Sequence, residues 1–173
     1  VLGGKVAAPD KIVINLTGDG GFGINPSCLA TAVEHGIACT WVVMNNSAFG
    51  TIAGLENANY KTKFGTVFYK PDGERYTICW ADVAKSYGIE SICVNSAEEF
   101  KPALEKAIAA NKEGRPFLVE APMENIVVPT PGCWNINDIY TPNALVKEGK
   151  LVKKENGRYV APSHSKSHDG CLN

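Results

Sequence analysis

The chain has 173 residues, 45% of them hydrophobic and 20% charged, so it is long enough for one globular domain with a buried core. Its 17 Lys and Arg against 18 Asp and Glu, without a basic block, argue against nucleic acid as a partner. No apolar run approaches the roughly 20 residues of a membrane span, and the start does not resemble a secretory leader, so we expect a soluble, cytoplasmic protein with no membrane contact.

Cysteine spacing gives no sign of a disulfide framework or of a metal cluster. The six cysteines are Cys28, Cys39, Cys79, Cys93, Cys133 and Cys171. They fall mostly inside apolar stretches, and no two of them form a C-x-x-C pair. We therefore expect buried thiols in a reducing compartment.

The first half of the chain alternates apolar, β-rich runs with a helical pattern. Strands are predicted over residues 11–16 and 38–44. Between them, Asn25 is a suitable N-cap, Pro26 suits the first helical position, and Gly36 is placed to end the helix. This order predicts a β-α-β unit.

The second half repeats the alternation. A helix over residues 78–87 ends at Gly88, and a short strand follows over 89–94. Ser96–Glu99 has the form of a capping box and opens an amphipathic helix that runs to about Ala110. A buried strand is predicted over residues 117–121.

Nearly continuous apolar strands predict a sheet that is buried on both faces. Such strands are typical of a mostly parallel sheet covered by helices, so we expect a three-layer α/β/α sandwich. From about Pro129 the composition shifts to Pro, Gly, Asn, Lys and Ser. We therefore expect one domain over residues 1–128 and a partly irregular C-terminal tail over 129–173.

Residues 18–23, Gly-Asp-Gly-Gly-Phe-Gly, match the dinucleotide pattern G-x-G-x-x-G. They follow the first predicted strand, where backbone N–H groups and a helix N-terminus bind phosphate. However, the carboxylate of Asp19 would repel a dinucleotide pyrophosphate, and the next strand ends in Asn45 and Asn46 rather than in an acidic residue. A carboxylate beside a diphosphate is instead explained by a divalent cation between them.

Magnesium is the cation that these residue types suit best. It prefers near-octahedral oxygen coordination with few protein ligands, and phosphate oxygens and water complete the shell. Asp19 offers a carboxylate and Asn46 a neutral side-chain oxygen, while the turn over residues 47–50 offers main-chain carbonyls. We therefore expect a magnesium site where the two strands end.

These residues also resemble a known family. Gly18-Asp19-Gly20, followed after 24 residues by Asn45-Asn46, resembles the thiamine diphosphate motif of the acetolactate synthase-like enzymes of the 2-oxo acid decarboxylase superfamily. Residues 4–10 and 81–88 are also similar to that family. The likeness covers about residues 3–125 and corresponds to the C-terminal, diphosphate-binding domain of a three-domain chain.

The resemblance implies a cofactor, a metal ion and their ligands. It makes the side chains of Asp19 and Asn46 and the backbone oxygen of Ala48 the magnesium ligands. The expected residues of the thiamine diphosphate site are Gly18, Asp19, Gly20, Gly21, Asn46, Ala48, Phe49 and Gly50, with the amides of Gly20 and Gly21 facing the diphosphate. In this family the segment that here carries Phe49, Thr51, Ile52 and Leu55 lines the substrate pocket.

The resemblance also implies a lyase or transferase that makes or breaks carbon–carbon bonds next to a carbonyl, through 2-oxo acid decarboxylation or acyl-carbanion carboligation. Its substrate would be a small 2-oxo acid or aldehyde. The catalytic glutamate of such enzymes lies on a pyrimidine-binding domain, normally of another subunit, and therefore outside this chain. Because only 17 residues precede Gly18, we expect a domain truncated at its N-terminus that works in a homo- or hetero-oligomer, a dimer or tetramer.

Two alternatives remain open. The thiamine subunit of a 2-oxoacid:ferredoxin oxidoreductase would share the motif, but such proteins usually bring cysteine-ligated iron–sulfur clusters. A non-catalytic nucleotide-binding α/β module would bind NAD or a mononucleotide without magnesium.

Overall fold

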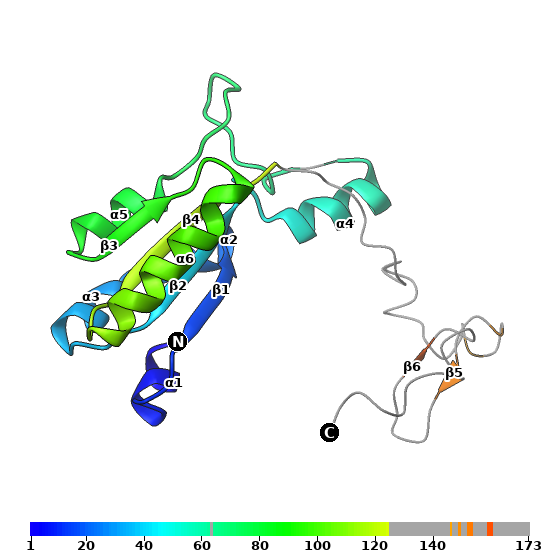
Figure 1. Ribbon diagram of the computed structural model, residues 1–173. Helices are drawn as coiled ribbons and strands as arrows, with labels where there is room; N and C mark the ends of the chain where they lie inside the picture. Colours follow the sequence, from blue (N-terminus) through cyan, green and yellow to red (C-terminus); the bar gives the residue numbers. More distant parts are fainter. Residues whose placement is uncertain (63, 125–145, 147–148, 150–151, 154–158, 161–173) are drawn as a thin grey trace.

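The computed structural model describes residues 1–62, 64–124, 146, 149, 152–153 and 159–160. Four strands form a parallel sheet in the order β1-β2-β4-β3 (Figure 1), which confirms the predicted α/β class. The strands are β1 (Ile14–Gly18), β2 (Thr40–Asn45), β3 (Glu90–Cys93) and β4 (Phe117–Pro122). The helices are α1 (Leu2–Ala7), α2 (Asp19–Phe22), α3 (Cys28–Glu34), α4 (Gly50–Tyr60), α5 (Trp80–Ser86) and α6 (Ala97–Lys112).

Helices cover both faces of the central strands, which gives three layers. On one face, Leu29 of α3 and Trp80 of α5 pack with Trp41 of β2. On the other face, the alanines of α6 at positions 103, 107 and 110 pack with Val42 and Phe117. Successive residues of β2 therefore point into opposite cores, as the unbroken apolar pattern predicts.

The edge strand β1 is less covered than the sequence predicts. Leu16 is the register partner of Val42, whose side chain packs with α6, yet Leu16 is 63% exposed. Ile14, two residues earlier on the same face, is 42% exposed. Among the described residues, the burial expected on both faces therefore holds for β2 and β4 but not for β1.

Several predicted boundaries in the first β-α-β unit are wrong; β2, for example, begins at Thr40 rather than at residue 38. β1 begins at Ile14 rather than at residue 11, because its ladder starts opposite Thr40, the first residue of β2. The third helix begins at Cys28 with Ser27 at its N-cap position and no side-chain capping hydrogen bond, and the side chain of Asn25 instead accepts a hydrogen bond from Ser27 Oγ at 2.5 Å. Its predicted end is confirmed, because Gly36 has a left-handed φ of 59°.

Later elements follow the prediction more closely. Gly88, with φ of 82°, ends the segment of α5, and Ser96 is the N-cap of α6. The capping interaction differs in one respect: Glu99 Oε2 accepts its hydrogen bond from the amide of Asn95 at 2.8 Å, one residue before the cap. The predicted pattern therefore located the helix start correctly but not the hydrogen-bonding partner.

The predicted tail over residues 129–173 lies mostly outside the described residues. Its described part includes a short antiparallel pair, β5 (Val152–Lys153) with β6 (Tyr159–Val160). The boundary between domain and tail therefore stays a prediction. Within the described ranges, no helix is long and apolar enough to cross a bilayer.

The described cysteines are free thiols with different exposures. Cys39 is buried, Cys28 and Cys93 are partly buried, and Cys79 is exposed, so the expected burial is wrong for Cys79. Cys133 and Cys171 lie outside the described residues. In the part of the chain that the structure describes, no group of three or more His, Cys, Asp or Glu side chains is placed to bind a metal ion.

Candidate cofactor and metal site

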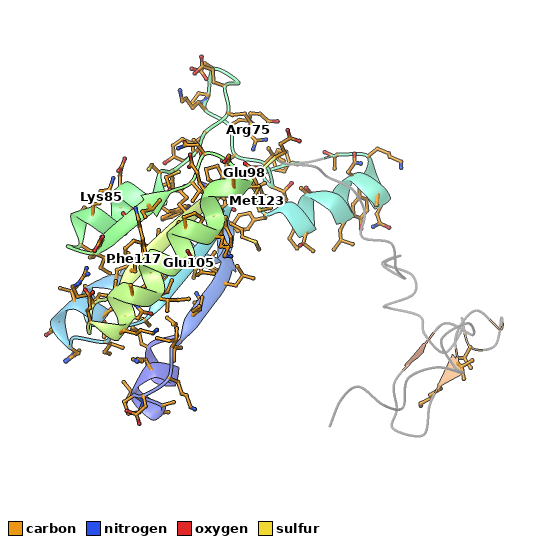
Figure 2. The ribbon with its side chains drawn as sticks, in the orientation of Figure 1. Arg75, Lys85, Glu98, Glu105, Phe117 and Met123 are labelled. Atoms are coloured by element: carbon orange, nitrogen blue, oxygen red, sulfur yellow. The ribbon has the colours of Figure 1, made fainter. Side chains whose placement is uncertain are left out.

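Three parallel strands end at the same edge of the sheet, and the predicted site residues gather there. Gly18 is the last residue of β1, and Asp19 begins the single turn of α2 directly after it. Asn45 ends β2, and Met123 follows the end of β4. Figure 2 shows Arg75 and Met123 toward this edge, with Phe117 at the opposite end of β4. In open α/β sheets this is the edge where ligands bind.

Asp19 has an incomplete set of partners. Its side chain is only 3% exposed, and Oδ2 accepts a hydrogen bond from the amide of Ala48 at 3.2 Å. Oδ1 is buried and has no hydrogen-bonding partner among the described residues. An ionised carboxylate is costly to bury unless it is paired or binds a metal, so this oxygen suits a cation.

Two close contacts at the site require glycine. A Cβ at Gly20 would lie 2.6 Å from the ring of Phe49, and a Cβ at Gly50 would lie 2.5 Å from Asn46 Nδ2. Both distances are too short for real side chains. Glycine at these positions therefore lets Phe49 lie against the backbone of α2 and lets the Asn46 side chain lie over the first turn of α4.

The predicted cofactor residues surround one cavity of about 360 Å³. Its walls are Gly18, Asp19, Gly20, Gly21, Asn46, Ala48, Phe49 and Gly50, together with Met44, Thr51, Ile52 and Met123. Of the predicted substrate-pocket residues, Phe49, Thr51 and Ile52 line this cavity, while Leu55 does not. Asp19, Gly20 and Phe49 also border a second, mostly apolar cavity of about 510 Å³.

The segment over residues 64–76 holds the Asn46–Ala48 turn from outside. The amide of Phe49 donates to Thr66 O at 2.8 Å, and the amide of Phe68 donates to Ser47 O at 3.1 Å. The guanidinium of Arg75 donates to Asn46 O at 2.8 Å. Because these contacts join segments that are distant in the chain, no local pattern predicts them.

Glu120 is a second buried carboxylate that the sequence analysis passed over. It lies in β4, is 2% exposed, and accepts a hydrogen bond from Asn45 Nδ2 at 2.7 Å. The pKa of the neighbouring Cys93 thiol is raised to about 11, mainly by burial and to a lesser extent by the negative charge of Glu120. A glutamate inside an apolar strand, Phe-Leu-Val-Glu-Ala, was the signal that could have revealed it.

Known proteins that resemble this chain agree with the chemistry of the site. The family described as "Thiamine pyrophosphate enzyme, C-terminal TPP binding domain" matches residues 1–121. The sulfoacetaldehyde acetyltransferase of Alcaligenes xylosoxydans xylosoxydans is 36% identical over 121 residues, covering 69% of this chain and 19% of that protein. The probable acetolactate synthase large subunit of Methanocaldococcus jannaschii is 32% identical over 133 residues, covering 76% and 21%.

A solved structure gives the same result. The thiamine diphosphate-dependent 4-hydroxybenzoylformate decarboxylase of Rhodococcus jostii RHA1 superposes with a TM-score of 0.59 at 27% identity, covering 71% of this chain and 22% of that chain. The chain spans about a fifth of the length of the curated relatives described above. The resemblance indicated by the Gly-Asp-Gly and Asn-Asn motifs is confirmed, and the chain belongs to the thiamine pyrophosphate enzymes, with residues 1–121 matching their C-terminal TPP binding domain.

Proposed function

We propose that this domain binds Mg²⁺ and the diphosphate end of thiamine diphosphate within an enzyme that makes or breaks carbon–carbon bonds next to a carbonyl. The observation that carries the proposal is the buried Asp19 Oδ1, which has no hydrogen-bonding partner among the described residues. A divalent cation would supply the missing partner and would neutralise the diphosphate beside it.

In this proposal, three oxygen donors of the chain hold the metal ion. They are the Asp19 carboxylate, the Asn46 side-chain oxygen and the backbone oxygen of Ala48. The contact between Ala48 N and Asp19 Oδ2 brings two of these residues together, and all three line the same cavity. Phosphate oxygens and water would complete an octahedral shell.

The diphosphate would lie along the start of α2. There the amides of Gly20 and Gly21 belong to the first helical turn, and such free N–H groups bind anions. Gly18, Phe49 and Gly50 form the remaining walls of the cavity. The residues of the chain thus orient the cofactor and balance its charge, while the bound cofactor supplies the electron sink for carbon–carbon chemistry.

The rest of the enzyme is proposed by analogy with the relatives. We expect a pyrimidine-binding domain, from the same polypeptide or another subunit, to supply the catalytic glutamate, in a cytoplasmic homo- or hetero-oligomer, a dimer or tetramer. We expect the substrate to be a small 2-oxo acid or an aldehyde. Residues 1–128 would form the diphosphate-binding domain, and 129–173 its C-terminal tail.

The test is Asp19→Ala in the complete enzyme that carries this domain. Thiamine diphosphate is titrated by calorimetry with and without Mg²⁺, and Asp10→Ala, which removes an exposed carboxylate, serves as the matched control. We expect Mg²⁺-dependent binding to be lost in Asp19→Ala and kept in Asp10→Ala. Unchanged binding in Asp19→Ala would disprove the site.

A further inference from the structure

Glu120 occupies an unusual position for a charged residue. It is almost fully buried in a central strand, and its partners are neutral donors: Asn45 Nδ2 at 2.7 Å, the amide of Ala81 at 2.8 Å and Cys79 Sγ at 3.7 Å. A buried carboxylate carries a desolvation penalty even when hydrogen-bonded, and an apolar residue would fill the strand without that penalty. The hydrogen bond between Glu120 and Asn45 indicates the role of this buried charge.

Asn45 has no free polar atom to offer to a metal ion. Its Nδ2 donates to Glu120 and to Ile78 O at 2.9 Å. Its Oδ1 accepts from the amide of Ser47 at 3.1 Å and lies 3.4 Å from Ser47 Oγ. The first amide of the Asn-Asn pair is therefore occupied by the protein itself, and it links β4 to the turn that follows β2.

The turn needs that link because it is strained. Ser47 has a φ of 52°, a left-handed conformation that is unfavourable for a residue other than glycine. The two contacts from Asn45 Oδ1 hold Ser47 in this conformation. The chain then reverses, so that the amide of Ala48 reaches Asp19 Oδ2 at 3.2 Å. Glu120, Asn45, Ser47 and Ala48 thus form a continuous path to Asp19.

We propose that Glu120 and Asn45 are positioning residues for the metal site. Glu120 fixes the orientation of the Asn45 amide, and Asn45 fixes the turn that carries Asn46 and Ala48 toward Asp19. This inference rests on the proposed function and adds two residues that would touch neither cofactor nor metal. It assigns Asn45, the first asparagine of the motif, to hold the turn, and it leaves Asn46, the second, to bind the metal ion.

The test reverses the direction of the hydrogen bond between Asn45 and Glu120, and it is done in the complete enzyme. Glu120→Gln places an amide nitrogen against either Asn45 Nδ2 or the amide of Ala81, and Asn45→Asp places two carboxylates face to face. The double variant restores one donor and one acceptor between positions 45 and 120 and keeps the original net charge. The Thr77 hydroxyl, 3.4 Å from Asn45 Nδ2, can donate to the new carboxylate, whereas Ile78 O then faces a second acceptor, so recovery is expected to be incomplete.

The readout is the dissociation constant of Mg²⁺ for enzyme saturated with thiamine diphosphate, measured by calorimetry. We expect each single variant to bind Mg²⁺ about 10-fold more weakly and the double variant to recover most of that loss, because a contacting pair is non-additive. The control is Asn111→Ala, which breaks a buried hydrogen bond to Thr40 at the other end of β2. It should lower stability and leave Mg²⁺ affinity unchanged.

Each other outcome overturns this inference or the proposed function beneath it. Single variants that bind Mg²⁺ as the parent does, a double variant no better than the singles, or an equal loss in Asn111→Ala would each contradict the positioning role. If the single variants do not fold, Asn45→Ala keeps the contact between Glu120 and Ala81, and unchanged Mg²⁺ affinity there contradicts the role. If the parent enzyme itself shows no Mg²⁺-dependent binding, the proposed function fails, not the positioning role alone.

Discussion

The two ends of β2 each place a polar side chain in the interior, and they complete its hydrogen bonds differently. At the amino end, Thr40 donates to Asn111 Oδ1 at 2.8 Å, and Asn111 Nδ2 donates to Arg115 O at 2.9 Å. At the carboxyl end, Asn45 is likewise satisfied, but the nearby Asp19 keeps one oxygen without a hydrogen-bonding partner in the described part of the chain. The hydrogen bonds at the amino end of β2 stabilise the fold, whereas the carboxyl end leaves a carboxylate oxygen that a ligand can use.

Backbone geometry shows the same contrast. β2 enters the sheet with its ladder in register from its first residue, since Thr40 pairs with both Ile14 and Phe117. It leaves the sheet through Ser47, whose φ is left-handed. Strain of this kind persists only where surrounding contacts determine it, and it gathers at functional sites. The predictions below test whether the carboxyl end is built for a ligand at the expense of stability.

The largest expected effect comes from Asp19→Asn. The amide keeps the shape of the carboxylate but removes an unpaired buried charge, so the cofactor-free enzyme should melt at a higher temperature. Mg²⁺ affinity should fall by about 100-fold or more, since the one charged ligand is lost. Thermal melts with and without Mg²⁺ and thiamine diphosphate check both the rise in melting temperature and the loss of Mg²⁺ affinity. A lower melting temperature in the cofactor-free state would contradict the idea that the buried charge of Asp19 destabilises this end of β2.

At the amino end, Asn111→Ala should act on stability alone. It leaves the buried Thr40 Oγ1 without its partner, which costs about 1–3 kcal/mol, and it also removes the hydrogen bond to Arg115 O. Hydrogen exchange of the β2 amides should show faster opening, while Mg²⁺-dependent cofactor binding stays at the parent level. Weakened cofactor binding would show that the two ends of β2 are coupled.

Gly50→Ala should produce a smaller effect that is confined to the site. The new Cβ would lie 2.5 Å from Asn46 Nδ2, so the amide has to turn away from its position over α4. We expect Mg²⁺ affinity to fall by about 10-fold, the equivalent of roughly 1.4 kcal/mol. Gly3→Ala is the matched control, because its Cβ would meet nothing within 4 Å. Equal Mg²⁺ affinity in both variants would remove Asn46 from the ligand set.

The smallest effect concerns two thiols, one near each end of the sheet. Burial raises the pKa of Cys39 and of Cys93 to about 11, so roughly one thiol in a thousand is ionised at pH 8. The charge of Glu120 contributes to the pKa of Cys93 and is not among the causes for Cys39. Glu120→Gln should therefore lower the pKa of Cys93, and that of Cys79, which the charge of Glu120 also raises, but not that of Cys39. Alkylation of Cys93 at pH 8 should speed up by a few-fold. Mass spectrometry of the labelled peptides measures both rates, and equal acceleration at Cys39 would indicate general loosening.

The sequence predicted the elements better than their boundaries. The central strands β2 and β4 were visible because each contains a nearly continuous apolar run. Gly36 and Gly88 marked helix ends because only glycine adopts positive φ without strain. The start of α3 was predicted two residues too early: the side chain of Asn25 accepts from Ser27 Oγ, and α3 begins without a side-chain capping hydrogen bond. The exposure of Leu16 was missed because apolarity alone does not specify what covers a strand.

What the sequence determined by itself was the fold class, the family and the set of residues around the candidate site. These follow from short motifs placed at strand ends, and parallel strands bring such ends to one edge. Only the tertiary structure showed that Glu120 accepts from Asn45, that Arg75 donates to Asn46 O, and that Asp19 Oδ1 has no hydrogen-bonding partner among the described residues. The physical reason is that hydrogen bonding and burial are properties of side chains brought together from β1, β2, β4 and the loop before α5, and no local pattern records which of those contacts form.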